Sequence, residues 1–244
     1  MKKHKTLWVG MICAFVPILI TIFLILFVFN QVGKMGENEI LHKTQNYEQL
    51  SQDSLKETAV FFGDSITELC PVEDLYAAYT RKTGVPIINR GISAETTDSM
   101  LKRIEKTVLV MKPKNLVMLM GINDIAAKVD NQQIVNNIKQ MITLTKQQSP
   151  KTHIILQAVY SINKTDRESL FDKFQLRDRD NHTIDELNEM LESLAKEEKI
   201  TFLNVNSYLM DKNKELKKEY TFDGLHPNMQ GYLAIRDAIL NVLD

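Results

Sequence analysis

The residues best suited to chemistry are a serine early in the regular part of the chain and a histidine near its end. Ser65 is the only serine that follows an apolar run within a Gly-Asp-Ser turn, and outside residues 31–56 only His226 has an acidic residue three positions earlier, Asp223. A serine hydroxyl needs a neighbouring base, histidine serves near neutral pH, and a carboxylate orients the imidazole. These residue types indicate acyl transfer through a serine nucleophile.

Acyl transfer also needs hydrogen-bond donors for the carbonyl oxygen that becomes negatively charged. Gly91 can offer a backbone N–H that no side chain obstructs, Asn123 a side-chain amide, and Ser65 its own N–H. Each of the three follows a different apolar run. Because ligands of open parallel sheets bind beyond the carboxyl ends of the strands, we expect these groups to meet at one edge.

In order and surroundings these residues resemble the SGNH hydrolases, also called the GDSL esterase/lipase family, over roughly residues 57–244. The signature residues of that family fall on Ser65, Gly91, Asn123 and His226, and its triad aspartate falls on Asp223. The resemblance implies Ser65 as nucleophile, His226 as base and Asp223 as its orienter. It also implies an oxyanion hole of Ser65 N–H, Gly91 N–H and Asn123, a flavodoxin-like three-layer α/β/α sandwich, and no cofactor or metal.

One position departs from the family, since many members have glycine where Ala94 stands. This puts the width of the pocket beside the oxyanion hole in doubt but removes no catalytic group. The G-x-S-x-G elbow is absent around Ser65, which disfavours the α/β-hydrolase fold. Taken singly, Ser65 is also a good helix N-cap, Gly91 a turn residue and His226 part of a helix entry. The catalytic interpretation is favoured because every role in the triad and the oxyanion hole is filled.

Five short apolar runs are typical of strands buried on both faces. They cover residues 58–62, 85–89, 116–120, 153–159 and 200–205. Segments with helical spacing separate them; one ends at Gly84 as a C-cap, and another begins with a capping box of Thr183 and Glu186. This alternation predicts an α/β domain in which a five-stranded parallel sheet lies between two helical layers.

One long loop, residues 163–181, leaves the sheet after the fourth run on the side of the predicted site. It contains Arg167, Arg177 and Arg179 together with Phe171 and Phe174. We hypothesise that this loop forms a wall of the substrate pocket. The alternative is a solvated charged loop that the two phenylalanines anchor.

The N-terminal region is of a different kind. Leu7–Phe29 contains no charged residue, and its 23 residues span roughly 35 Å as a helix, enough to cross a bilayer core. Lys2, Lys3 and Lys5 precede it and predict a cytoplasmic N-terminus with the rest outside. A cleaved signal peptide is the alternative, but the run is long for one and its exit, Phe29-Asn30-Gln31-Val32-Gly33, is a poor cleavage site. We expect an anchor at 1–30, a polar stalk at 31–56 and the catalytic domain at 57–244.

Composition bounds the remaining possibilities. The chain has 244 residues, 44% hydrophobic and 25% charged, which fits a folded domain of ordinary size with an appendage. A net charge of -1 gives no support for nucleic-acid binding. Cys13 lies in the predicted membrane segment and Cys70 in the domain, so no internal disulfide is expected.

Together these features predict a membrane-anchored serine esterase that acts outside the cytoplasmic membrane. A small domain leaves little chain for a lid, which favours short acyl groups, and O-acetyl groups on envelope polysaccharide are the expected substrate. The same residues also allow hydrolysis of lysophospholipid or other lipid esters, and acyl transfer to a sugar hydroxyl. A non-catalytic surface-binding module would have a broken triad or oxyanion set, and here both sets are complete.

Overall fold

The C-terminal part of the protein is built on a parallel sheet whose strands follow the predicted apolar runs. The computed structural model describes residues 2–53, 56–165 and 169–243, with side chains from Val16 onward. The strand order is β2-β1-β3-β4-β5, and every neighbouring pair is parallel. The strands are β1 (Ala59–Gly63), β2 (Ile87–Gly91), β3 (Asn115–Leu119), β4 (His153–Gln157) and β5 (Thr201–Leu203). Each overlaps its predicted run, so the predicted sheet is confirmed.

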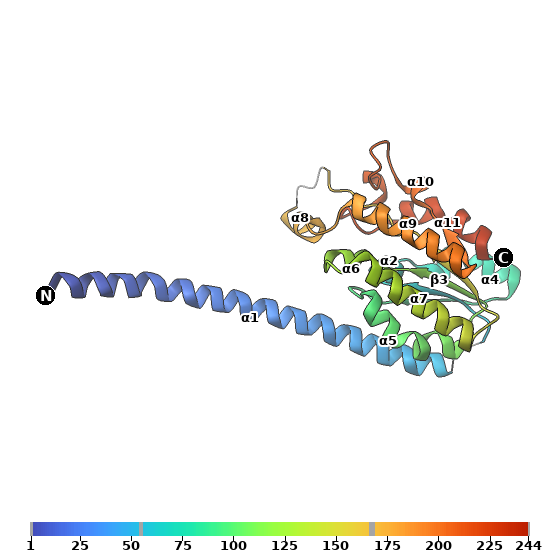
Figure 1. The fold of residues 1–244 in the computed structure, drawn as a ribbon, viewed down its shortest axis with the longest axis horizontal. Coiled ribbons are helices and arrows are strands. Elements are labelled where there is room, and N and C mark those ends of the chain that lie inside the picture. The colour runs from blue at the N-terminus through green and yellow to red at the C-terminus, as the bar shows by residue number, and fades with distance from the viewer. Residues whose placement is uncertain (1, 54–55, 166–168, 244) are drawn as a thin grey trace. The chain divides into compact units, whose positions relative to one another are not determined.

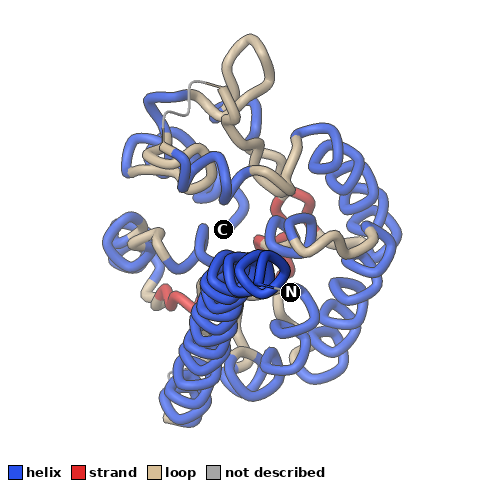
Figure 2. The backbone as a smooth tube through the Cα atoms, turned by 90° about the vertical axis from the view of Figure 1, so that its left-hand side faces the viewer, coloured by secondary structure: helices blue, strands red, loops and turns tan. Residues whose placement is uncertain are grey.

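Helices cover both faces of this sheet (Figures 1 and 2). They are α2 (Ser65–Glu68), α3 (Val72–Leu75), α4 (Ala77–Thr83), α5 (Thr97–Thr107), α6 (Ile122–Ala126), α7 (Asn131–Gln148), α8 (Leu170–Leu176), α9 (Asn181–Glu198), α10 (Asn206–Leu209) and α11 (Met229–Leu243). Helix α7 contacts both α5 and α9, and these three form one layer. The right-handed crossover from β1 to β2 places α4 on the other face. Helix α11 lies beside it, since Tyr79 Oη donates to the carbonyl of Leu243 at 3.0 Å. The predicted three-layer sandwich is confirmed.

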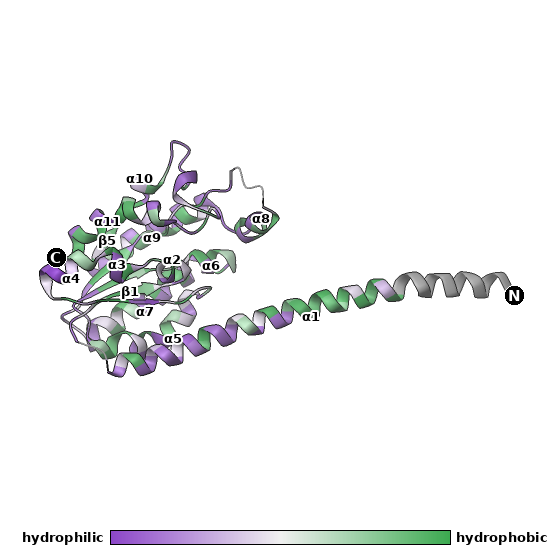
Figure 3. Ribbon diagram, turned by 180° about the vertical axis from the view of Figure 1, so that it is seen from behind, coloured by the Kyte–Doolittle hydropathy of each residue, from purple (hydrophilic) through white to green (hydrophobic). Residues whose placement is uncertain are grey.

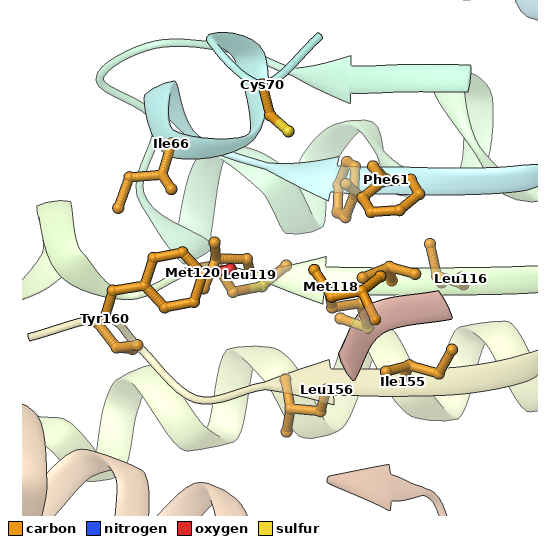
Figure 4. Close-up of a cluster of buried hydrophobic side chains, with 14 of the residues drawn as sticks. Phe61, Ile66, Cys70, Leu116, Met118, Leu119, Met120, Ile155, Leu156 and Tyr160 are labelled. Carbon is orange, nitrogen blue, oxygen red and sulfur yellow. The ribbon is translucent and has the colours of Figure 1, made fainter. Parts of the chain in front are cut away.

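The hydrophobic core lies between the sheet and the two helical layers. Phe61, Met118 and Leu156 come from β1, β3 and β4 and are all buried (Figure 4). The ring of Phe61 stacks on that of Tyr76, with centroids 5.2 Å apart. Cys70 is a free, buried cysteine beside this cluster. Because apolar side chains are needed on both faces of the sheet, the strands have continuous rather than alternating apolar sequences.

Two helix ends test the capping predictions. Gly84 closes α4 with a φ of 72°, a left-handed conformation that suits glycine, so the predicted C-cap is confirmed. The predicted capping box of Thr183 and Glu186 is wrong, because α9 begins at Asn181 with Asp180 as its N-cap. The carboxylate of Asp180 accepts from the N–H of Thr183 at 2.9 Å and from its hydroxyl at 2.7 Å. The threonine hydroxyl is therefore a donor to the cap.

The long helix α1 (Lys2–Gln52) contributes to both compact units of the chain, Met1–His42 and Lys43–Asp244. Within the second unit its last turns pack on the sheet domain. The buried hydroxyl of Ser51 donates to the carbonyl of Thr107 at 2.8 Å, and Tyr47 Oη donates to the carbonyl of Gly91 at 3.3 Å. The sequence placed the domain boundary at residue 57, whereas packing begins near residue 43. Polar side chains that bind backbone carbonyls make these contacts, so apolar periodicity gave no sign of them.

The first unit is helical and apolar in its middle. The part of α1 with described side chains, Val16–Gln52, is long and apolar enough to cross a membrane, with a mean hydropathy of 2.3 in its most apolar window. Nothing in that window is buried inside the protein. Figure 3 shows the hydrophobic stretch of α1 giving way to a hydrophilic one toward the C-terminal end of the helix. The expectation of one apolar N-terminal helix is confirmed by length and composition.

Candidate active site

The serine stands at a sharp turn between β1 and α2. Gly63 ends the strand, Asp64 caps the helix by accepting from the N–H of Ile66 at 2.9 Å, and Ser65 is the first helical residue. A side chain at Gly63 would place its Cβ 2.3 Å from the carbonyl oxygen of Leu119 on the neighbouring strand. Glycine and aspartate therefore build the turn, and the nucleophile is placed at the carboxyl edge of the sheet.

His226 and Asp223 reach this serine from the segment before α11. The Nε2 atom of His226 lies 2.8 Å from Ser65 Oγ, and its Nδ1 atom lies 2.5 Å from Asp223 Oδ2. The other carboxylate oxygen of Asp223 accepts from the backbone N–H groups of Leu225 and His226 at 2.9 and 2.8 Å. The structure thus brings together the three residues that the sequence proposed as nucleophile, base and orienter.

Two further contacts hold this hydrogen-bonded chain. Burial alone would raise the pKa of Asp223, but the hydrogen bonds from His226 outweigh burial and hold that pKa well below its usual range. Gln175 in α8 also donates to Asp223 Oδ2, at 3.1 Å. The ring of Phe222 stacks on the imidazole of His226 at 5.9 Å between centroids. The carboxylate therefore stays ionised, and the imidazole is fixed on two sides.

Asn123 lies in α6, directly after β3, which is the strand beside β1. Its Nδ2 atom donates to the carbonyl of Glu95 at 3.0 Å. Its Oδ1 atom accepts from Nη2 of Arg179 at 2.8 Å. The amide has two N–H groups, so one of them remains available to a ligand. Asn123 therefore lies just beyond the end of β3, the neighbour of the strand that leads to Ser65, as expected for the predicted oxyanion donor.

Gly91 ends β2 on the other side of β1, but its N–H already has an acceptor. It donates to Asn89 Oδ1 at 2.8 Å. A side chain at Gly91 would place its Cβ 2.3 Å from the backbone nitrogen of Glu68, so glycine is required here for packing of α2. Because the Gly91 N–H is bound to Asn89 and not free for a substrate oxygen, the proposed oxyanion hole does not include Gly91.

Ala94 occupies the exposed turn three residues later, where many family members have glycine. It has a φ of 64°, in the left-handed region that glycine enters without strain. Within the described part of the chain, no residue accepts from its N–H. Glu95, the next residue, is buried and forms an ion pair with Arg103 at 2.5 Å. The ion pair anchors the turn that carries this free N–H.

Asp64, next to the nucleophile, is a buried carboxyl group with an unusual titration. Burial raises its pKa from 3.8 to about 7, and its Oδ2 atom has no hydrogen-bond partner among the described residues. In the unfolded chain the group ionises near 3.8, so folding keeps a proton that the unfolded chain has lost. This stabilising contribution is complete below the unfolded pKa and is lost as the pH rises through the folded pKa.

We therefore expect Asp64→Asn, which cannot ionise, to resist alkaline pH better than the wild type. Between about pH 5 and about pH 8 the stability of the variant relative to the wild type should rise by about 2–3 kcal/mol. Thermal unfolding of both proteins in the same detergent at the two pH values measures this change. Asp74→Asn, at an exposed carboxyl, should show no such rise. An equal stability difference at both pH values would refute a raised pKa for Asp64.

The ends of three neighbouring strands and the segment before the last helix thus converge on one hydrogen-bonded serine. This arrangement is suited to acyl transfer through a serine nucleophile, the chemistry of a carboxylic ester hydrolase. The family model described as GDSL-like lipase/acylhydrolase matches residues 61–234, well over half of the chain. The protein belongs to this family, as its resemblance to the SGNH hydrolases predicted.

Individual relatives agree with this class. The chain is 28% identical over 209 residues to an isoamyl acetate-hydrolyzing esterase of Saccharomyces cerevisiae, covering 77% of this chain and 86% of the yeast protein. It is 22% identical over 218 residues to an acetylxylan esterase of Geobacillus stearothermophilus, covering 75% and 92%. A solved structure from Streptococcus pneumonia, with a provisional description as a platelet activating factor, superposes with a TM-score of 0.82 at 26% identity. That match covers 89% of this chain and 99% of the other.

The sequence did not indicate two residues that support the catalytic side chains through hydrogen bonds. Arg179 and Gln175 contact Asn123 and Asp223, yet the sequence placed them only in a loop of uncertain role. Arg177 instead binds Asp178 at 2.6 Å, and Arg167 lies outside the described residues. Nothing in the spacing of the three arginines distinguishes Arg179 from the other two.

Proposed function

We propose that the protein is a membrane-anchored serine esterase that removes short acyl groups, acetyl above all, from carbohydrate of the cell envelope. The observation that carries the proposed mechanism is the unbroken chain from Ser65 Oγ through His226 to Asp223, with distances of 2.8 and 2.5 Å. Both distances are those of direct hydrogen bonds, which a nucleophile, its base and the orienting carboxylate require.

In the proposed reaction Ser65 Oγ attacks the ester carbonyl carbon while its proton passes to Nε2 of His226. The bond from that carbon to the alcohol oxygen then breaks, and the alcohol leaves with the proton from His226. The acyl group remains on Ser65 as an ester. Water gives a proton to His226 and attacks the carbonyl carbon of this ester. The bond from that carbon to Ser65 Oγ then breaks, the proton on His226 returns to Oγ, and the acid leaves. The carboxylate of Asp223 stabilises the imidazolium that forms in both halves of the reaction.

For the oxyanion we propose three donors on the turns around the serine. They are the N–H of Ser65, the free N–H of Asn123 Nδ2 and the N–H of Ala94. In the described part of the chain neither backbone N–H has an acceptor. Gly91 is replaced by Ala94 in this proposal because the Gly91 N–H donates to Asn89. Donors fixed before the substrate arrives cost no reorganisation during the reaction.

Two relatives support an acetyl substrate. The yeast relative is named for hydrolysis of isoamyl acetate and the Geobacillus relative for acetylxylan. One of these esters has a small alcohol and the other a polysaccharide, but the acyl group is acetyl in both. This common feature favours acetyl esters for the present chain. We propose envelope polysaccharide as the alcohol because the catalytic domain is proposed to lie outside the membrane.

The location rests on the apolar helix. We propose that this helix is an uncleaved anchor, with Lys2, Lys3 and Lys5 on the cytoplasmic side and Lys43–Asp244 outside. The length and hydropathy of Val16–Gln52 support a membrane span, and the three lysines before it support the orientation.

A lipid ester is the second candidate, because apolar side chains are exposed on the helix that contacts the triad. In α8 Leu170, Phe171 and Phe174 are more than half exposed, and Phe222 beside His226 is 62% exposed. Exposed apolar side chains on the helix that contacts Asp223 could pack against an alkyl chain of a substrate. This observation also keeps open the hypothesis that α8 is a pocket wall.

A series of nitrophenyl esters from acetyl to long acyl decides between the candidates. We expect kcat/KM of the full chain in detergent to be highest for acetyl, and intact cells to deacetylate an O-acetylated polysaccharide that cannot cross the membrane. Phe171→Ala and Phe174→Ala should leave this preference unchanged if the substrate is a carbohydrate acetate. A maximum at long chains that these two variants abolish would instead establish the lipid candidate and the pocket wall. Release of acetate only from disrupted cells would contradict the proposed location.

A further inference from the structure

The oxyanion amide is held in one of its two orientations by a charged donor on one side and a backbone carbonyl on the other. An asparagine amide can present either its oxygen or its nitrogen to a neighbour. Asn123 faces Nη2 of Arg179 at 2.8 Å, and a guanidinium has only donors. Only Oδ1 can therefore lie against Arg179, so Nδ2 must face the other way, toward the carbonyl of Glu95 at 3.0 Å.

Arg179 is itself fixed by the same turn that it orients. Its Nε atom donates to the carbonyl of Ile122, the residue before Asn123, at 3.2 Å, and its Nη1 atom donates to the carbonyl of Gln175. The residue is only 9% exposed. One guanidinium thus binds the backbone and the side chain of the Asn123 turn and the end of α8. Rotation of Asn123 would break the hydrogen bond to a group that has little freedom to follow.

Among the described residues, no carboxylate lies within ion-pair distance of the Arg179 guanidinium, in contrast to Arg103, which pairs with Glu95. The carboxyl groups of Asp64, Asp178 and Asp223 act on its charge only from a longer distance. A buried cation bonded only to neutral oxygens is costly for folding. The same cation polarises the Asn123 amide and so strengthens its N–H as a donor to a developing negative charge.

We infer that Arg179 is a positioning residue for the oxyanion hole: it locks Asn123 with Nδ2 available to the substrate oxygen and strengthens that donor. This rests on the proposed function, since it presupposes that Asn123 binds the oxyanion. Arg179 does not touch the substrate. Its contribution should therefore disappear when the amide of Asn123 is absent.

A double-mutant cycle on the full chain in detergent, with nitrophenyl acetate as substrate, tests this inference. Asn123→Ala should lower kcat by roughly 10²–10³-fold. Arg179→Met should lower kcat by roughly 10–100-fold with KM changed less than about threefold, and Arg179→Lys should recover part of the loss. The double variant should lie within about threefold of Asn123→Ala alone. Arg81→Met, at an exposed arginine in α4, is the control and should retain wild-type activity.

A folded Arg179→Met enzyme with wild-type kcat would overturn the inference, and so would losses that multiply in the double variant. Multiplied losses would mean that Arg179 supports the fold and not the amide. Thermal unfolding identifies a variant that fails to fold; in that case the cycle is run with Arg179→Lys, and losses that multiply in its double variant overturn the inference. Wild-type activity of Asn123→Ala is a separate result. It would remove Asn123 from the proposed oxyanion hole, and the inference about Arg179 with it.

Discussion

Ser65→Ala should lower kcat for nitrophenyl acetate by roughly 10⁵–10⁶-fold while leaving a folded protein. The substitution removes only the hydroxyl group, whose oxygen lies 2.8 Å from His226 Nε2. Without it no acyl-enzyme can form, and only the small acceleration from the oxyanion donors remains. Initial rates at saturating ester, with thermal unfolding as the check on folding, measure this loss.

Ser207→Ala is the matched control, because it removes the hydroxyl of an exposed serine in α10. It should leave kcat unchanged. A Ser65→Ala protein that keeps more than about a hundredth of the wild-type kcat would show that another group is the nucleophile.

Asp223→Asn should lower kcat by about 10⁴-fold at neutral pH. In the wild type, Asp223 Oδ2 faces Nδ1 of His226 at 2.5 Å, which fixes the proton on Nδ1 and leaves Nε2 free to accept from Ser65. An asparagine can turn its NH₂ group toward Nδ1, which favours the opposite tautomer with the proton on Nε2. The base is then blocked although the hydrogen-bonded geometry is kept.

The pH dependence of kcat separates this effect from a loss of folding. In Asp223→Asn the rate should recover in part at alkaline pH, where hydroxide can take the proton that His226 cannot. Asp237→Asn, at an exposed carboxylate in α11, should behave as the wild type. If Asp223→Asn stayed within about tenfold of the wild type across the pH range, the carboxylate would not orient the base.

The sheet was predictable because its burial leaves a direct trace in the residues. Strands such as Ala59–Gly63 and Asn115–Leu119 are buried at every position, and each overlaps an apolar run in the sequence. The edge strand Thr201–Leu203 is shorter than the predicted run of 200–205, because Val205 is apolar and buried although it lies beyond the strand, before α10. Apolar runs thus locate strands well and bound them poorly.

The residues of the triad were predictable for a different reason. Ser65, Asp223 and His226 lie in short turns whose neighbours are fixed by local geometry, such as the aspartate N-cap at Asp64. Short-range constraints of this kind survive as sequence motifs. His226 comes three positions after Asp223, and this separation allows its backbone N–H to donate to the Asp223 carboxylate.

The supporting contacts could not be predicted, because they join segments far apart in the chain through single polar atoms. Arg179 meets Asn123 from a segment without apolar periodicity. Lys43, in α1, binds Glu68 at 2.5 Å, and Glu68 also accepts from the N–H of Ser93 at 2.6 Å, beside Ala94. Such contacts depend on how the elements pack, and no local pattern encodes them. For the same reason the sequence did not indicate that residues 43–52 pack on the sheet domain.

Trapping the acyl-enzyme tests the central claim most directly. The full-length protein is mixed with nitrophenyl acetate, quenched in acid within the first turnover and digested, and the peptides are weighed by mass spectrometry. We expect the mass of one acetyl group on the peptide that contains Ser65, with fragmentation placing it on that serine, and no adduct in Ser65→Ala. An active enzyme that carries no acetyl group on Ser65, or carries it on another residue, would show that Ser65 is not the nucleophile.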